Sequence, residues 1–224
     1  MALELKNLHF TYKGAEKETI RGIDLKLESG SFTVISGPNG SGKTTLSKLL
    51  CGILKPTLGS IDADGVGILF QVPENQLFQA TVLEDVMFGP LNFGRTRDQA
   101  REDAIRALES VGIGEEFYSR DPFRLSDGQK RLVALAGVLA CGFTTLVLDE
   151  VAAGLDWKTE QKVFEILKNL QKSGMTIIVI SHDPGHAQYA DRYLHMKGGV
   201  LSDGVPDPDI LTLIEKDIHF FPEI

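Results

Sequence analysis

The stretch Gly37-Pro38-Asn39-Gly40-Ser41-Gly42-Lys43-Thr44 matches the pattern G-x-x-x-x-G-K-[ST] in full and indicates a phosphate-binding loop. It follows Phe32–Ile35, which predict a strand, and precedes a helical segment at Lys43–Ile53. In this context the glycines let backbone N–H groups converge on phosphate oxygens at the positive start of a helix. Lys43 would reach the β- and γ-phosphates, and Thr44 would ligate Mg²⁺. The alternative, an ordinary glycine-rich turn, does not require a strand before it and a helix after it.

Apolar runs elsewhere in the chain predict a sheet of mostly parallel strands. Thr145–Leu148 and Thr176–Ile180 are continuous apolar runs, typical of parallel strands buried on both faces. Between them, residues from Val163 to Leu170 recur on one face of an amphipathic helix. Val82–Phe88 and Asp98–Val111 also have helical patterns. Strands that alternate with helices around glycine-rich turns predict an α/β core with an inserted helical piece.

The composition is that of a folded protein without a general affinity for polyanions. The chain has 224 residues, 42% hydrophobic and 24% charged, which suits one large domain or a core with a modest subdomain. Its 23 Lys and Arg residues against 31 Asp and Glu residues give a net charge of −8, which disfavours nucleic acid and anionic membrane surfaces as partners. Cys51 and Cys141 lack CxxC spacing, so we expect buried thiols in a reducing compartment rather than a metal site.

One stretch resembles a membrane span. Leu132–Leu148 carries no charge and is close to the shortest length that crosses a bilayer as a helix. Gly142 and the β-branched Thr144 and Thr145 interrupt it, so we expect a helix followed by a buried strand. The first residues of the chain alternate polar and apolar and lack the apolar core of a signal peptide, which predicts a cytosolic chain.

A pair of acids at the end of a predicted strand supplies groups that a nucleotide site needs besides its phosphate loop. Asp149 and Glu150 follow the apolar residues Leu146–Leu148, where two adjacent acids are costly unless they are used. In this interpretation Asp149 holds Mg²⁺. Glu150, where the chain turns out of the sheet, polarises water towards the γ-phosphate. The alternative is a solvated pair that caps a strand.

A second polar cluster, Leu125-Ser126-Asp127-Gly128-Gln129, opens the apolar helix that leads to Cys141. On physical grounds it is another anion-binding helix start, with the Ser126 hydroxyl and the Gly128 N–H as candidate phosphate donors. One nucleotide seldom needs two such cradles in a single chain.

In the order of these motifs the sequence resembles the nucleotide-binding subunit of an ATP-binding-cassette (ABC) transporter over nearly the whole chain. The ordered motifs are Tyr12 as the adenine-stacking aromatic, the loop Gly37–Thr44, Gln71 as the Q-loop glutamine, the LSDGQ signature, the Asp149-Glu150 pair, Ala153–Asp156 as the D-loop, and Ser181-His182-Asp183 with the switch histidine. The resemblance implies an ATPase that binds ATP and Mg²⁺. It also implies a head-to-tail homodimer or heterodimer, in which each ATP lies between the loop of one subunit and the signature of the other.

The motifs and the resemblance together define the expected site and fold. Hydrolysis is assigned to Glu150, His182 and Gln71, and the metal to Thr44, Gln71 and Asp149. Nucleotide contacts are assigned to Tyr12, Gly37, Pro38, Asn39, Gly40, Ser41, Gly42, Lys43, Thr44, Thr45, Ser126, Gly128 and Gln129. The implied fold is a single α/β domain over residues 1–224. Its P-loop NTPase core, residues 1–72 and 136–224, has a mostly parallel sheet and an antiparallel β region, and residues 73–135 form a helical subdomain with the signature.

A narrower resemblance is to the ATPases of energy-coupling-factor importers, which take up vitamins and cobalt or nickel ions. It rests on Phe70–Phe78, Thr81–Val86 and Phe88–Pro90. It implies a subunit at the cytoplasmic face of the cell membrane whose segment Pro73–Phe78 contacts a transmembrane partner. The alternative is that Pro73–Phe78 is only the surface entrance of the helical subdomain.

Several positions depart from the family pattern. Asp127 replaces the first glycine of the usual LSGGQ, so it either weakens one ATP site or points away from phosphate and favours the helix dipole. Val151 stands where the family usually has proline, and Leu132 where it usually has arginine, with Arg131 one position earlier. A C-terminal regulatory domain found in some relatives is expected to be absent.

Alternatives remain for one histidine pair and for the function as a whole. His182 and His186 have the i, i+4 spacing of a zinc site, but Pro184 and Gly185 between them discourage a regular helix. Other candidate functions are a cassette ATPase of another transporter and a non-transport ABC ATPase that acts on DNA. A catalytically weak partner in a heterodimer is a further candidate. The acidic charge and the lack of a long coiled-coil insertion disfavour the DNA function.

Overall fold

The structure is a computed structural model that describes residues 2–63 and 65–204, and its centre is a six-stranded sheet. The strand order is β5 (Val66–Leu69), β6 (Thr145–Asp149), β7 (Thr176–Ile180), β3 (Phe32–Ser36), β8 (Arg192–Lys197) and β9 (Val200–Asp203). Neighbouring strands from β5 to β8 are parallel, and β9 is antiparallel to β8. Every residue of β3, β6 and β7 is buried, which explains why their sequences are continuous apolar runs.

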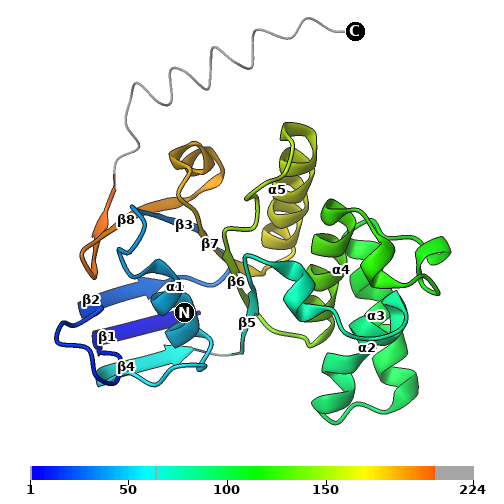
Figure 1. The fold of residues 1–224 in the computed structure, drawn as a ribbon, viewed down its shortest axis with the longest axis horizontal. Coiled ribbons are helices and arrows are strands. Elements are labelled where there is room, and N and C mark those ends of the chain that lie inside the picture. Colours follow the sequence, from blue (N-terminus) through cyan, green and yellow to red (C-terminus); the bar gives the residue numbers. More distant parts are fainter. Residues whose placement is uncertain (1, 64, 205–224) are drawn as a thin grey trace, which may run out of the picture.

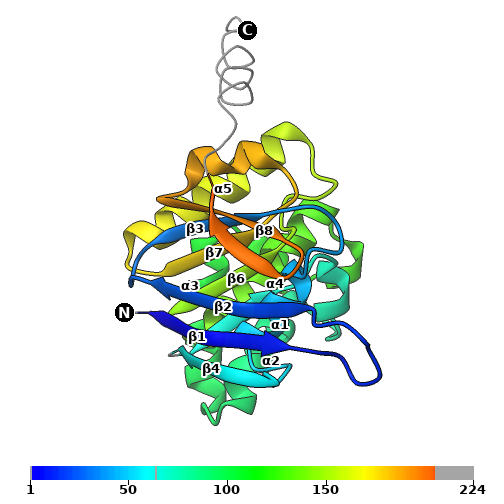
Figure 2. The ribbon, with the colours of Figure 1, turned by 90° about the vertical axis from the view of Figure 1, so that its left-hand side faces the viewer.

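A second sheet, of three antiparallel strands, lies beside the first and faces the viewer in Figure 2. Its order is β2 (Ile20–Leu27), β1 (Leu3–Phe10) and β4 (Leu58–Ala63). Side chains of both sheets and of helix α1 (Lys43–Leu50) share one apolar cluster, to which α1 contributes Leu46, Leu49 and Leu50. The helix that follows the glycine-rich loop is therefore fixed from two sides.

Three helices form a separate group at the β5 edge of the central sheet (Figure 1). They are α2 (Val82–Asn92), α3 (Arg97–Ser110) and α4 (Asp127–Ala140). The short helix η1 (Pro73–Gln76) precedes α2, and the short helices η2 (Glu115–Phe117) and η3 (Pro122–Arg124) lie between α3 and α4. The helix caps Thr81, Thr96 and Ser126 each accept a hydrogen bond from the backbone N–H three residues further on. Each helix thus begins at a polar capping residue and carries apolar residues on one face, which explains why the sequence predicts helices in this part of the chain.

Helix α5 (Trp157–Lys172) and the short helix η4 (Pro184–Tyr189) pack with the sheet in a second apolar cluster, which also includes the three helices of the β5 edge. Phe164 of α5 is fully buried and stacks on Phe32 of β3, with 6.5 Å between the ring centroids. The parallel strands point their carboxyl ends to one edge of the sheet, where the loops after β3, β5, β6 and β7 meet.

The structure confirms the interpretation of the uncharged run Leu132–Leu148 as the end of α4 followed by β6. Among the described residues, no helix combines the length and apolar character that a membrane crossing needs. Helix α4 crosses residue 135, where the sequence placed the end of the helical part. Residues 205–224, the last part of the predicted core, lie outside the described residues.

The two thiols are less enclosed than the sequence suggested. Cys51 and Cys141 are free and half-buried rather than fully buried. Burial raises the pKa of Cys51 to about 12 and that of Cys141 to about 11, so both thiols stay protonated at neutral pH.

Candidate functional site

A cavity of about 760 Å³ opens where the loops at the carboxyl ends of the central strands meet. The glycine-rich loop after β3 forms one wall. Gln71 after β5, Glu150 after β6 and His182 after β7 line the same cavity. The parallel sheet therefore brings together the loop and three residues assigned to hydrolysis that are distant in sequence.

The shape of the loop depends on two of its glycines. Gly37 has a φ of +153°, and a Cβ atom there would lie 2.1 Å from the carbonyl oxygen of Met196. Gly42 has a φ of +109°, and a Cβ atom there would lie 3.0 Å from the carbonyl oxygen of Thr19. Gly42 caps α1 without a side-chain hydrogen bond, so the first-turn N–H groups of α1 are not capped by a side chain.

Lys43 places a positive charge inside this loop. The residue is buried, and its Nζ donates hydrogen bonds to the carbonyl oxygens of Gly37 at 2.6 Å and Pro38 at 3.1 Å. The ammonium group is thus held at the wall of the cavity together with the N-terminus of α1. Both features favour a polyanion such as a triphosphate.

Asp149 lies at the end of β6 and is buried behind the loop, not among the residues that line the cavity. Its Oδ2 accepts a hydrogen bond from the Ser47 hydroxyl at 3.1 Å. Burial raises the pKa of the Asp149 carboxyl, and hydrogen bonds from Ser47 and Thr44 oppose this rise. A desolvated carboxylate beside two hydroxyl groups offers the oxygen ligands that Mg²⁺ prefers, so these residues fit that ion.

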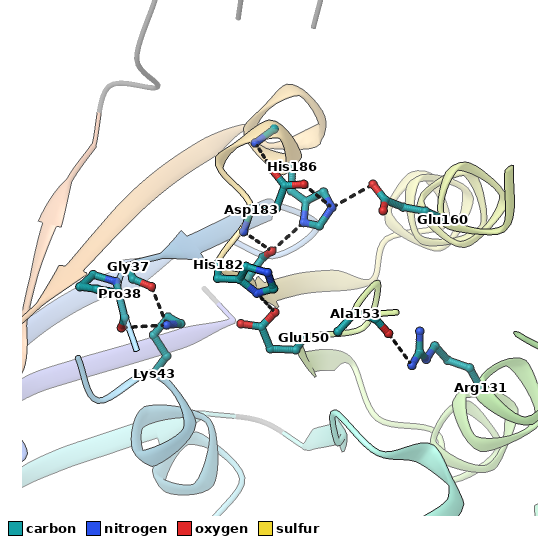
Figure 3. A network of polar contacts seen from close by, with 12 residues as sticks. Gly37, Pro38, Lys43, Arg131, Glu150, Ala153, Glu160, His182, Asp183 and His186 are labelled. Atoms are coloured by element: carbon teal, nitrogen blue, oxygen red, sulfur yellow. Dashed lines mark hydrogen bonds and ion pairs between the residues drawn. The ribbon is translucent and has the colours of Figure 1, made fainter. Parts of the chain in front are cut away.

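Glu150 and His182 form a pair at the cavity. The Nδ1 of His182 lies 2.6 Å from the Oε2 of Glu150 (Figure 3). The Glu150 N–H donates to the Ile180 carbonyl at 2.8 Å. Glu150 has a φ of +54°, a left-handed conformation that is costly outside glycine and that concentrates at functional sites. The strained backbone turns this carboxylate out of the sheet towards the cavity.

Tyr12 lies beside α1 and does not line the cavity. Its hydroxyl is 3.1 Å from the Thr45 Oγ1, and its ring meets that of Phe10 edge to face, with 4.8 Å between the centroids. The ring is 41% exposed. The predicted residues Gly37–Gly40 and Gly42–Thr45 line the cavity, whereas Ser41 is buried and does not line it.

The signature residues do not line the cavity formed by the loop of the same chain. Ser126 caps α4 in a reciprocal pair with Gln129, since each accepts a hydrogen bond from the backbone N–H of the other. Asp127 is exposed in the first turn of α4 and lies 3.5 Å from the ammonium of Lys130. The two predicted phosphate cradles therefore occupy different places in one chain.

A hydrogen bond connects the signature helix to the D-loop Ala153–Asp156. Arg131 of α4 is buried and donates from its Nη2 to the Ala153 carbonyl at 3.2 Å. Figure 3 shows this contact beside the Glu150–His182 pair. Arg131, one position before the usual arginine of the family, thus connects α4 to the D-loop.

Five residues of the cavity wall were not predicted from the sequence: Thr19, Ser36, Pro184, Tyr193 and His195. Ser36 ends β3, and its hydroxyl lies 2.5 Å from that of Tyr193 and 3.3 Å from the Nδ1 of His195. Tyr193 and His195 belong to β8, which pairs with β3. Predicting Tyr193 and His195 would require the order of the strands in the sheet, which the sequence alone does not give.

Comparisons with known proteins agree with this geometry. A family model described as ABC transporter matches residues 20–153. The energy-coupling factor transporter ATP-binding protein EcfA2 of Lactobacillus gasseri is 43% identical, over 100% of this chain and 85% of the relative. The EcfA2 protein of Streptococcus sanguinis is 41% identical, over 100% of this chain and 87% of the relative.

Solved structures show the same fold. CbiO1 from Clostridium perfringens, described as part of the ABC transporter complex CbiONQ, is similar with a TM-score of 0.85 and 34% identity, covering 97% of this chain and 95% of that one. The dimeric ATP-binding cassette MJ0796 bound to ADP and Pi has a TM-score of 0.78 and 29% identity, covering 90% of this chain and 98% of that one. The chain therefore belongs to the ABC transporter family, among the energy-coupling factor transporter ATP-binding proteins.

Proposed function

We propose that this chain is the ATP-binding and ATP-hydrolysing subunit that powers a membrane importer of the energy-coupling-factor type. The single observation that carries the proposal is the cavity that Lys43 and the Glu150–His182 pair share. It combines a cradle for a triphosphate with a carboxylate and an imidazole placed to act on its terminal phosphate.

In the proposed reaction Lys43 and the loop N–H groups hold the β- and γ-phosphates. Glu150 accepts a proton from the attacking water through its carboxylate, and His182 orients the γ-phosphate region next to it. Thr44, Gln71 and Asp149 would hold Mg²⁺, and the ion would supply positive charge that offsets the charge of the phosphates. The ring of Tyr12 stacks on the adenine.

The second cradle serves a second cassette, which is either another copy of this chain or a related one. Ser126, Gly128 and Gln129 do not line the cavity of their own chain, and in the proposal they contact the phosphates held by the partner. The relative MJ0796 is described as dimeric, which supports this arrangement. Hydrolysis then depends on two cassettes that close on ATP.

The surface proposed to meet a transmembrane subunit is the segment Pro73–Phe78 and the cavity beside it. This cavity, about 260 Å³, is lined by apolar side chains that include Phe78, Phe88 and Phe143. Phe78 is 53% exposed and Phe88 40%, and their rings meet edge to face. Exposed aromatic side chains around a hollow suit an apolar partner helix.

We propose further that the subunit lies at the cytoplasmic face of the membrane and that the imported solute is a vitamin or a cobalt or nickel ion. Residues 73–135, which hold α2, α3 and the start of α4, would form the part that meets the membrane complex. Residues 1–72 and 136–224 would form the nucleotide-binding core. Recognition of the solute would reside in another polypeptide.

Purification of the tagged chain from native membranes in detergent, followed by identification of the attached proteins, tests the transport function. We expect integral membrane proteins and a second cassette in the complex, and more ATP hydrolysis by the complex than by the chain alone. A chain that hydrolyses ATP but attaches only to DNA-bound proteins would favour a non-transport function. A complex that is silent at the site formed by the partner's loop and this chain's signature would favour a weak partner whose Asp127 disfavours phosphate.

A further inference from the structure

His186 is a buried histidine with no part in the proposed reaction. It lies in η4 and is 4% exposed. Its ring centroid is 4.5 Å from that of Phe164, which stacks on Tyr189 at 4.3 Å. Packing against these aromatic rings fixes the plane of the imidazole and therefore the direction of both ring nitrogens.

Both nitrogens have polar partners, as Figure 3 shows. Nδ1 lies 2.8 Å from the Ser181 hydroxyl, and Nε2 lies 3.1 Å from the Glu160 Oε1. The Ser181 hydroxyl also accepts the N–H of Asp183 at 2.9 Å. One arrangement satisfies every group without a charge on the ring: Ser181 donates to Nδ1, and Nε2–H donates to the Glu160 carboxylate.

A divalent cation is the competing explanation for this cluster. Glu160, Asp183 and His186 present ligand atoms that all lie within 4.8 Å of one another. In the hydrogen-bonded arrangement, however, Nε2 carries a proton and has no lone pair for a metal. Asp183 already accepts the Gly185 N–H through its Oδ1 at 2.7 Å. Hydrogen bonding accounts for the cluster without an ion.

The hydrogen-bond chain brackets the switch histidine, because it includes the residues on both sides of His182. It ends at Glu160, in the first turn of α5. The N-cap of α5 is Asp156, the last residue of the D-loop, and its side chain accepts a hydrogen bond from the Thr159 N–H at 3.1 Å. The backbone that carries His182 is thus tied to the helix start that follows the D-loop.

We propose that His186 is a positioning residue that acts through Ser181 to hold His182 against Glu150. Through Glu160 it also fixes the position of this pair relative to the D-loop. The His182 side chain is 63% exposed, so packing around the ring does little to fix it and its backbone must do so. The proposal rests on the proposed function, since it assigns His182 a place in hydrolysis.

Steady-state ATP hydrolysis by the membrane complex tests this proposal in four variants. His186→Phe keeps an aromatic ring against Phe164 but loses both hydrogen bonds, and Ser181→Ala removes only the hydroxyl. Glu160→Leu removes the acceptor, whereas Glu160→Gln keeps an oxygen at its position. Glu165→Leu, at an exposed position on the same helix, is the matched control for Glu160→Leu.

We expect His186→Phe, Ser181→Ala and Glu160→Leu to lower kcat about 10- to 100-fold through misplacement of His182, with KM for ATP unchanged. Glu160→Gln should keep the parental rate, because the amide oxygen accepts Nε2–H. The double variant Ser181→Ala with His186→Phe should be no slower than His186→Phe alone, since both break one chain of contacts. In ¹⁵N spectra of the full chain, His186 should have the Nε2–H tautomer, and Ser181→Ala should shift the ring signals of His182.

Parental kcat in both His186→Phe and Ser181→Ala would overturn the proposal, even if the melting temperature of His186→Phe falls. A loss in Glu160→Gln as large as in Glu160→Leu would overturn the hydrogen-bond chain and favour a bound cation. Glu150→Gln is measured beside them: if it hydrolyses ATP at the parental rate, the proposed function has failed rather than the role of His186.

Discussion

At the scale of single residues, Lys43 supplies the buried positive charge of the proposed phosphate site. Lys43→Ala removes the charge that the Gly37 and Pro38 carbonyls hold at the cavity. We expect ATP affinity to fall about 10- to 100-fold, the equivalent of about 1.5–3 kcal/mol for a charge-assisted contact. Equilibrium titration with a fluorescent ATP analogue measures this. Lys55→Ala, at an exposed position outside the cavity, is the control, and equal affinities in the two variants would contradict the loop assignment.

The sequence predicts a role at the site for some residues near the cavity and not for others. The glycine-rich loop, Asp149 and Glu150 are predictable, because fixed spacing and costly buried charge are properties of a local stretch. Tyr193 and His195 are not, because they reach Ser36 only through the pairing of β8 with β3. His186 resembled a zinc ligand in sequence, and its partner Glu160 is a neighbour only in the fold.

At the scale of elements, Asp85 of α2 fixes the end of the segment proposed to meet the membrane subunit. Its Oδ2 accepts the backbone N–H groups of Phe78 and Gln79, each at 2.7 Å. Asp85→Ala leaves both donors without this partner and should destabilise the fold by about 1–3 kcal/mol. Urea unfolding measures the loss. Glu84→Ala should cost less, because the exposed side chain of Glu84 accepts a hydrogen bond from the helix cap Thr81 and holds no backbone N–H of the segment.

The same carboxyl gives a prediction for pH. Burial raises the pKa of Asp85 above the ordinary 3.8, although the hydrogen bonds from Gln79 and Phe78 oppose the rise. The folded chain then holds the proton more tightly than the unfolded chain. The contribution of this group to stability is fully present below about pH 3.8 and is lost as pH rises through the raised pKa. Relative to Asp85→Asn, the parent should lose stability over that pH window, and a gain over the same window would contradict this sign.

Elements were predictable where their pattern is local. The run Leu132–Leu148 resolves into α4 and β6 because Gly142 ends a helix and β-branched residues follow. Helix α1 ends at Leu50 rather than at the predicted Ile53, since the last residues before Lys55-Pro56 form a turn. The start of β2 and the order of strands in both sheets depend on long-range pairing, which periodicity does not encode.

At the scale of the whole molecule, the two proposed phosphate cradles lie apart in one chain, because the signature residues do not line the cavity of the loop. Ser126→Ala should therefore leave ATP affinity of the single chain at the parental value, because Ser126 is not part of its own cavity. In the complex with a second cassette it should lower hydrolysis, since the partner loses a phosphate donor. A loss of single-chain affinity as large as in Lys43→Ala would contradict the head-to-tail arrangement.

The sharpest test of the proposed hydrolysis is the variant Glu150→Gln, measured by single-turnover hydrolysis in the complex of this chain with its membrane partners. The amide keeps the size of the side chain that contacts His182 but cannot accept a proton from water. The proposed role of Glu150 predicts parental ATP affinity, accumulation of a closed ATP-bound pair of cassettes, and almost no hydrolysis in the cavity of this chain. Hydrolysis at the parental rate would contradict it.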